Sequence, residues 1–419
     1  MREYIKLKGV VKFSQGIQIP IEDQSLNKMN GSVRFVRIVD YTKSGGEPPR
    51  YINSCNDKYL VNDEDVVMIR YGSKTAGQVA RGISGAIANN MFQIKILDES
   101  KLDKNYLYWY LAQESTYQRL NGSQSSSTMP AITFGMIGDF EIPVLDIKDQ
   151  KKLSEMFSIY QNLIENNNRR IAILEEMAQS LYREWFVNFR YPGHADTVDA
   201  SLDEKQGNPK LIDSALGQIP EGWEVKDIGS IAKVKGGKRL PKGKKVLDEN
   251  TDFPYLRVTD FKEFGLERSK IKFIDEESHK ANKRYVISIK DVYISIAGTI
   301  GRVGIIPSDL DGSNLTENAA KICDFIDPYW QLYVLRFLRS YMGQKTLMAR
   351  TSGSSQPKLA LYKISEMPLL LPPENLLTKF TYIASNLEQL IENLDKKNDN
   401  LNKQRDMLLP KLISGQIEL

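Results

Sequence analysis

Lys12-Phe13-Ser14-Gln15-Gly16-Ile17-Gln18-Ile19-Pro20 occurs in a second version, Lys233-Val234-Lys235-Gly236-Gly237-Lys238-Arg239-Leu240-Pro241, in which Lys, Gly and Pro keep their places. Two more pairs of segments follow in the same order: residues 36–41 match residues 256–261, and residues 59–72 match residues 285–298. Each copy then ends in a Ser-rich loop with a Pro, followed by a long polar segment. The offset between the copies drifts only from 220 to 229 residues. Such a repeat predicts two similar domains that differ by short loop insertions.

Both copies have the pattern of an α+β domain. Short β-branched runs, such as residues 33–39 and 66–70, are separated by Gly and Asn turns and interrupted by a helical stretch. We therefore predict two similar strand-rich α/β globular domains, separated by two long antiparallel coiled-coil helices and related by a pseudo-two-fold internal repeat. The predicted boundaries are residues 1–147 for the first domain, 148–189 for the central helix, 190–222 for a linker, 223–372 for the second domain and 373–419 for the C-terminal helix.

The two long helices are predicted from apolar residues that recur alternately three and four positions apart. In the central helix these are Phe157, Tyr160, Ile164, Ile171, Leu174, Ala178, Leu181 and Trp185, with Asn167 at one position of the seam. In the C-terminal helix they are Phe380, Ile383, Leu387, Leu390, Leu394, Leu401 and Leu408, with Lys397 and Gln404 at polar positions of the seam. A lone heptad helix more often forms a homodimer, but two such helices in one chain favour pairing within the chain.

The composition is that of an ordinary globular protein, with 41% hydrophobic and 26% charged residues. No apolar run is long enough to span a membrane and no signal peptide is recognisable, so we expect a cytoplasmic protein. Cys55 and Cys323 stand at unequal places in the two copies and do not indicate a disulfide. The net charge is only +4, but residues 233–245 hold seven basic residues and no acid. This run suits either a nucleic-acid contact or a merely solvated surface.

The sequence contains no recognisable motif for catalysis or metal binding. The only histidines, His194 and His279, leave little material for a histidine-based triad or a metal site. The glycine-rich residues 298–304 lack the spacing of a dinucleotide fingerprint, and residues 237–245 resemble a phosphate loop only superficially. The sequence also lacks an Asn-Pro-Pro-Tyr or Asp-Pro-Pro-Tyr methyltransferase motif. We therefore expect no catalytic residue, no metal site and no cofactor in this chain.

Three parts of the chain carry distinctive motifs: residues 181–193, which read Leu-Tyr-Arg-Glu-Trp-Phe-Val-Asn-Phe-Arg-Tyr-Pro-Gly, residues 213–214 and 217–223 before the second domain, and residues 408–415 at the end. With these motifs and the duplicated domains, the whole chain resembles the specificity (S) subunit of type I restriction-modification enzymes. The resemblance implies two target-recognition domains that each read one half of an asymmetric, interrupted double-stranded DNA site. It implies that the helices set the spacer and dock two methyltransferase (M) subunits, and that a restriction (R) subunit joins the full complex. Adenine methylation with S-adenosylmethionine, and any ATP and Mg chemistry, would then belong to the partner subunits.

The chain departs from the family pattern at its beginning. The Gly-Trp-Glu-Val lead-in at residues 222–225 has no clear counterpart before Ile5. We expect the C-terminal helix to supply the missing neighbour of the first domain.

Side chains that could contact DNA are polar or basic residues on the loops of both copies. In the first domain the candidates are Lys12, Gln15, Gln18, Arg37, Arg70, Ser73, Lys74 and the loop 124–128. In the second they are Lys235, Lys238, Arg239, Lys242, Arg257, Thr299, Arg302, Ser355, Gln356 and Lys358. The apolar residues of the helices expected to dock partners are Ile164, Ile171, Leu174, Leu181, Trp185, Leu387, Leu390, Leu394, Leu401 and Leu408.

Comparison of the two copies distinguishes framework or phosphate-contacting residues from residues that read bases. Arg37 with Asp40, and Arg257 with Asp260, recur in both copies and are expected to be framework residues or phosphate contacts. Positions that differ, such as Arg70 against Ile296, are better candidates for reading sequence. Lys238 and Arg239 are expected to hold phosphates, so that Arg239→Ala would weaken DNA binding and flatten its salt dependence.

Two other classes of function stay open at this point. The chain could be a coiled-coil protein-interaction scaffold without DNA recognition, which failure to co-purify with a methyltransferase would favour. It could also be an enzyme with an unrecognised site. Methylation of DNA by the purified chain with S-adenosylmethionine, and no partner, would favour that alternative.

Overall fold

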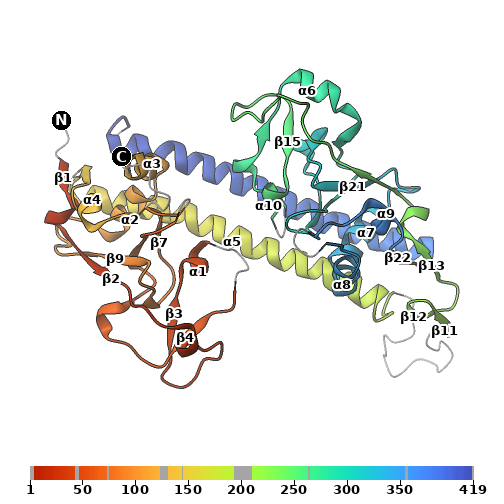
Figure 1. The fold of residues 1–419 in the computed structure, drawn as a ribbon, viewed down its shortest axis with the longest axis horizontal. Coiled ribbons are helices and arrows are strands. Elements are labelled where there is room, and N and C mark those ends of the chain that lie inside the picture. The colour runs from red at the N-terminus through yellow and green to blue at the C-terminus, as the bar shows by residue number, and fades with distance from the viewer. Residues whose placement is uncertain are drawn as a thin grey trace. The chain divides into compact units, whose positions relative to one another are not determined.

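The computed structural model describes residues 4–42, 47–72, 75–122, 131–143, 145–192, 210–262, 265–353 and 357–417. The chain forms two compact units, one made of Met1–Ile164 with Asn400–Leu419 and the other of Glu165–Asp399. Each unit contains part of two long helices, α5 (Ile147–Phe186) and α10 (Glu374–Ser414) (Figure 1). The division therefore falls inside both helices, whereas the sequence placed the domain boundaries at their ends. The reason is that each part of a helix packs into the core of one unit.

The first unit is built on two four-stranded sheets. One has the order β2-β9-β6-β7 and is antiparallel throughout. The other has the order β4-β3-β8-β5, with β3 and β8 parallel. The strands are β1 (Tyr4–Lys6), β2 (Val11–Gln15), β3 (Val33–Val36), β4 (Arg50–Ile52), β5 (Leu60–Val61), β6 (Val66–Ile69), β7 (Val79–Ala80), β8 (Gly85–Ile87), β9 (Met91–Ile96) and β10 (Glu141–Pro143). The short helices are α1 (Ile38–Thr42), α2 (Lys104–Leu111), α3 (Glu114–Gly122) and α4 (Phe134–Gly138).

The two four-stranded sheets of the second unit repeat this topology strand for strand. Its sheets have the orders β14-β21-β18-β19 and β16-β15-β20-β17, and β15 and β20 are again the parallel pair. The strands are β11 (Leu211–Ser214), β12 (Gly217–Pro220), β13 (Glu224–Asp227), β14 (Lys233–Gly236), β15 (Pro254–Leu256), β16 (Lys272–Phe273), β17 (Val286–Ile287), β18 (Val292–Ser295), β19 (Val303–Ile305), β20 (Ser313–Leu315), β21 (Ala319–Cys323) and β22 (Pro368–Leu371). The helices are α6 (Glu276–Ala281), α7 (Trp330–Arg339), α8 (Tyr341–Ala349) and α9 (Leu361–Ser365). The predicted internal repeat of α+β domains is confirmed.

The central strands are buried because their sequences are apolar and largely β-branched. All four residues of β6 and of β18 are buried, which explains why these two segments match between the copies. The repeated glycines have a different cause. A Cβ atom on Gly16 would overlap the carbonyl oxygens of Ile87 and Ala88, and one on Gly237 would overlap those of Leu315 and Thr316. Each copy therefore needs Gly directly after strand β2 or β14, where the backbone passes close to the end of strand β8 or β20.

The lead-in strand has a counterpart in the first unit. β13 pairs antiparallel with β22, and β1 pairs in the same way with β10. The C-terminal end of α10 packs beside them, since Leu409, Leu412 and Ile413 belong to the core cluster that contains Leu7 and Ile142. The expectation that the C-terminal helix is a neighbour of the first domain is confirmed.

The predicted linker, residues 190–222, is only in part described. Residues 193–209 lie outside the described residues, but β11 and β12 form an antiparallel hairpin. Ile219 of that hairpin is 4% exposed and belongs to the core of the second unit. The end of the predicted linker is therefore folded structure, because it carries an apolar side chain that the core buries.

The two long helices run antiparallel within each unit. In the second unit the amide of Asn398 accepts a hydrogen bond from Asn167 and donates one to Asn168, both at 2.9 Å. Further along, the Phe380 ring packs against the ring of Trp185, with the centroids 6.2 Å apart. In the first unit Arg405 donates to Gln161 at 3.3 Å. As the residue number rises along α5, the number of the α10 residue that it contacts falls, which is the antiparallel arrangement.

In the predicted seam of the C-terminal helix every second residue is exposed, and the others are buried or half-buried. Ile383 and Leu390 are 39% and 51% exposed and Lys397 is exposed, whereas Phe380, Ala384 and Asn398 are buried. Among the other predicted apolar seam residues, the buried ones are Phe157, Ile164, Ala178 and Trp185, and the half-buried ones are Tyr160, Ile171, Leu174, Leu181, Leu387, Leu394, Leu401 and Leu408. The sequences of the two long helices can be aligned on a shared tetrapeptide. Leu-Ile-Glu-Asn occurs at residues 163–166 of α5 and again at residues 390–393 of α10. The Leu of both tetrapeptides is exposed.

Candidate nucleic-acid interface

In the first unit three predicted contact residues meet beyond the end of β2. Gln15 donates from Nε2 to the carbonyl oxygen of Asn89 at 3.0 Å, and its Oε1 accepts from Nη1 of Arg70 at 2.8 Å. The side chain of Asn89 donates in turn to Oε1 of Gln18 at 3.2 Å. The guanidinium of Arg70 also lies 5.0 Å from the ring centroid of Tyr71. The ends of β2 and β6 and the β8–β9 turn therefore present one connected set of polar side chains.

The second unit has an ion pair at the corresponding place. Nε of Arg239 donates to Oε1 of Glu317 at 2.7 Å. Oε2 of Glu317 accepts from Thr316 at 3.0 Å and from Tyr255 at 3.4 Å. Partial burial alone would raise the pKa of the Glu317 carboxyl, but the hydrogen bond from Arg239 and further hydrogen bonds lower it below its usual value. Glu317 is therefore ionised at neutral pH, and it holds a guanidinium whose side chain is 81% exposed.

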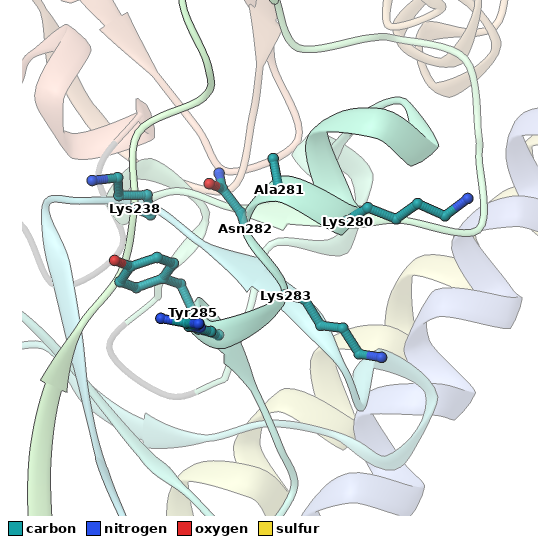
Figure 2. Close-up of a pocket in the computed structure, with 7 residues that line it drawn as sticks. Lys238, Lys280, Ala281, Asn282, Lys283 and Tyr285 are labelled. Carbon is teal, nitrogen blue, oxygen red and sulfur yellow. The ribbon is translucent and has the colours of Figure 1, made fainter.

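A basic cleft lies beside this ion pair, on α6 and the turn after it. It has a volume of about 590 Å³ and is lined by Lys238, Lys280, Ala281, Asn282, Lys283, Arg284 and Tyr285. Figure 2 shows Lys280 and Lys283 extending toward one side of the cleft and Lys238 lying at the other, beside the Tyr285 ring. Nζ of Lys238 is 5.5 Å from the centroid of that ring. The buried Asn282 donates to the carbonyl oxygen of Arg239 at 3.2 Å, which joins the cleft to the ion pair.

The arginines shared by both units are held inside the framework. Arg37 donates to Asp40 at 3.2 Å, and Arg257 donates to Asp260 at 2.7 Å. The two carboxylates are only 3% and 0% exposed. Arg257 also donates to the carbonyl oxygen of Lys270 at 2.6 Å. These side chains brace equivalent turns, which suits the framework role that the sequence offered for them.

Other predicted contact residues do not join these groups. Lys235 pairs with Asp324 at 2.8 Å, and Arg302 donates to the carbonyl oxygen of Phe261. The exposed candidates away from the polar groups are Lys12, Lys242, Thr299 and Lys358. Ser73, Lys74, Ser355, Gln356 and the loop 124–128 lie outside the described residues.

Sequence reasoning missed Asn89, Glu317, Lys283 and Arg284. Residues 280–284 hold three basic residues within five positions, and this cluster is the signal that could have identified Lys283 and Arg284. Asn89 and Glu317 could have been found from their neighbours, because residues 87–90 and 315–318 both follow a buried strand and both end in Asn. Within the described part of the chain, no three His, Cys, Asp or Glu side chains gather in a way that could hold a metal ion. None of the described helices combines the length and apolarity needed to cross a membrane.

The family comparison matches both halves of the chain. Residues 2–176 and residues 220–404 each match the model of the type I restriction modification DNA specificity domain. The two matched stretches make up most of the chain and contain both polar groups described above.

Named relatives and one solved structure agree with this match. The chain is 27% identical over 357 residues to the type I restriction enzyme MjaIX specificity subunit of Methanocaldococcus jannaschii, covering 82% of this chain and 76% of that protein. It is 21% identical to the EcoBI specificity subunit of Escherichia coli, covering 84% and 71%. The crystal structure of the S subunit of a type I restriction-modification system from M. genitalium has a TM-score of 0.54 at 17% identity, over 98% of this chain and 96% of that one. That structural likeness concerns the fold. These matches give no support to the coiled-coil scaffold without DNA recognition.

Proposed function

This chain belongs to the type I restriction modification DNA specificity family and is a specificity subunit, and from that premise we propose that its two globular units read the two halves of one asymmetric, interrupted DNA site. The observation that carries the proposal is that sheets of one topology present unlike side chains at equivalent positions. Arg70 bonds through its backbone N–H to the carbonyl oxygen of Asn90, as Ile296 does to that of Asn318. Two units that share one fold but expose different side chains suit two different half-sites, whereas two units with the same side chains would suit a palindrome.

The basic cleft supplies contacts to the DNA backbone in this proposal. Lys238, Lys280, Lys283 and Arg284 bring four cations to one surface, and only Lys280 has a carboxylate partner among the described residues, Glu276 at 2.7 Å. Cations that are not neutralised within the protein can displace counterions from phosphates. Contacts of this kind fix the position of a protein on the duplex, while other side chains read the bases.

The long helices dock two M subunits and set the spacer between the half-sites. Apolar side chains that the helices leave exposed are the expected contacts. Ile173 and Met177, one turn apart on α5, are 60% and 52% exposed, and Leu163 and Leu390 are 45% and 51% exposed. Apolar surface that is left in water by the chain itself favours burial by a partner.

Catalysis lies in the partner subunits of the cytoplasmic complex. Specificity subunits of type I systems are non-catalytic. The M subunits methylate adenine with S-adenosylmethionine, and R subunits with ATP and Mg join the full complex. The chain itself takes none of these cofactors.

The test is a map of methylated adenines in the genome of the host with and without this gene. Deletion should remove one bipartite, asymmetric methylated motif, and a plasmid-borne copy should restore it. The purified chain alone, incubated with DNA and S-adenosylmethionine, should methylate nothing. A methylome that deletion leaves unchanged would refute the proposal.

A further inference from the structure

Gln18 and Arg239 occupy the same place in the two units. The backbone N–H of Gly16 donates to the carbonyl oxygen of Met91, as that of Gly237 does to Ala319. The next N–H in each unit donates to the last residue of the parallel strand, so that Ile17 bonds to Ile87 and Lys238 to Leu315. The residue after each of these, Gln18 or Arg239, is therefore equivalent. By the same bonds, Asn89 after β8 is equivalent to Glu317 after β20.

The two equivalent positions make the same contact with different chemistry. In the first unit the side chain of Asn89 donates to that of Gln18 at 3.2 Å, which is a pair of amides. In the second unit Arg239 donates to Glu317 at 2.7 Å, which is an ion pair. The framework arginines beside them, Arg37 and Arg257, keep both residue and partner in the two units. The backbone of these loops is thus the same in both units, whereas the side chains that the loops present form an amide pair in one unit and an ion pair in the other.

The contacts around Arg239 orient its guanidinium and leave most of it exposed. Glu317 engages Nε, and among the described residues no partner is found for Nη1 or Nη2. Glu317 is itself held by Thr316 and Tyr255. A guanidinium held through Nε keeps its remaining donors free, and Arg donates two hydrogen bonds to O6 and N7 of guanine in the major groove.

Gln18 is presented in a comparable way, by the neutral side chain of Asn89. Asn89 contacts its amide, and the carbonyl oxygen of Asn89 accepts from Gln15, which Arg70 holds in turn. An exposed amide offers a donor and an acceptor together, and this combination matches N7 and N6 of adenine. Within the bipartite function proposed above, on which this inference rests, we infer that Gln18 with Asn89 contacts adenine in one half-site and Arg239 with Glu317 contacts guanine in the other. Arg239 is thereby assigned to a base and not to the phosphate expected from sequence.

The inference is tested by mapping methylated motifs in hosts that express the full complex with Arg239→Gln, Arg239→Lys or Gln18→Ala. Both Arg239 variants should lose about tenfold or more of the discrimination at one base pair of one half-site, because Gln has no positive charge and the flexible ammonium of Lys lacks the planar fork that Glu317 orients. Gln18→Ala should relax one base pair of the other half-site. Lys226→Gln, which removes an exposed cation paired with Glu224, should leave both half-sites unchanged.

Each other outcome has a definite meaning. An unchanged motif with weaker methylation in Arg239→Gln, restored by Arg239→Lys, would make Arg239 a phosphate contact and overturn the inference. A change in both half-sites from either single substitution would also overturn it. If the wild-type complex methylates a bipartite motif and the variants leave it unchanged, only this inference fails. If the wild-type complex methylates no such motif, the proposed function fails.

Discussion

At the scale of single residues, the glycine after the first sheet strand is the point where sequence and fold are most tightly joined. Gly16 and Gly237 align in the sequence, and the structure shows that each lies against backbone carbonyl oxygens that cannot move away easily. The neighbouring Gly236 differs, since a Cβ there would meet only the side chain of Leu361, at 3.5 Å. Two adjacent glycines thus have unequal importance for the fold.

We predict that Gly237→Ala destabilises the protein by about 1–3 kcal/mol, since the added methyl group forces the backbone apart as in an overpacked core. Gly236→Ala is the matched control and should change the midpoint of thermal unfolding little. The measurement is the unfolding midpoint of both variants and the wild type by calorimetry. Equal midpoints for the two variants would contradict the close approach that the structure describes.

The cleft residue Lys283 gives a second prediction at this scale. Lys283→Ala should weaken DNA binding by the assembled complex to a similar extent for all sequences. It should also reduce the slope of log K against log salt by about 0.9, the value for one phosphate contact. Binding titrations at several salt concentrations measure both effects. Lys226→Ala, which removes an exposed lysine paired with Glu224, is the control and should keep the wild-type slope.

At the scale of elements, a buried charge cluster joins α7 to both long helices in the second unit. Arg336 of α7 donates to Glu175 of α5 at 2.5 Å and to Glu388 of α10, and its side chain is 1% exposed. Arg339 adds bonds to Glu175 at 2.9 and 2.8 Å. Burial raises the pKa of Glu388, and the nearby arginines only partly offset this effect. Arg336 therefore ties the helix pair to the globular part of its unit.

We predict that Arg336→Met destabilises the protein by about 3–5 kcal/mol at neutral pH, because it leaves the buried carboxylate of Glu388 without its partner. The loss should shrink as the pH falls. A carboxyl group whose folded pKa is raised penalises the folded state above that pKa and not below it. Denaturant unfolding between about pH 7 and pH 4 measures the change. The double variant Arg336→Met/Glu388→Met should recover much of the stability, and no recovery would contradict the assignment.

At the scale of the whole molecule, α5 and α10 each have residues in both units, and under the proposed function their length sets the spacer of the DNA site. The division between the units falls after Ile164 in α5 and after Asp399 in α10. An insertion of seven residues at each point keeps the apolar faces in phase, because the heptad repeat is preserved. It adds about 10.5 Å of helix at 1.5 Å per residue.

We predict that this paired insertion lengthens the spacer of the methylated motif by about three base pairs, at about 3.4 Å per base pair. Both half-sites should keep their sequence, because no reading residue changes. Insertion into α5 alone is the control and should abolish methylation, since the two helices no longer match. Methylome mapping measures the spacer, and an unaltered spacer in the doubly extended protein would show that the helices do not set it.

The sequence by itself determined the duplication, the α+β character of both copies, the two long helices and the choice of Gln15 and Gln18 as neighbouring candidates in one segment. These features depend on local patterns: repeated anchors, β-branched runs and apolar periodicity. The polar pairs and the cleft were beyond sequence reasoning, since Arg239 meets Glu317 only where the ends of separate strands come together.

Only the tertiary structure decided which helix face is buried. Periodicity alone could not separate Ile383 from Ala384 or Lys397 from Asn398, because both choices recur at nearly the same spacing. Contacts with α5 selected the face that buries Asn398 between Asn167 and Asn168 and leaves Leu390 exposed. The physical reason is that a helix buries whichever face its partner covers. That choice is made by side chains more than two hundred residues away in the chain.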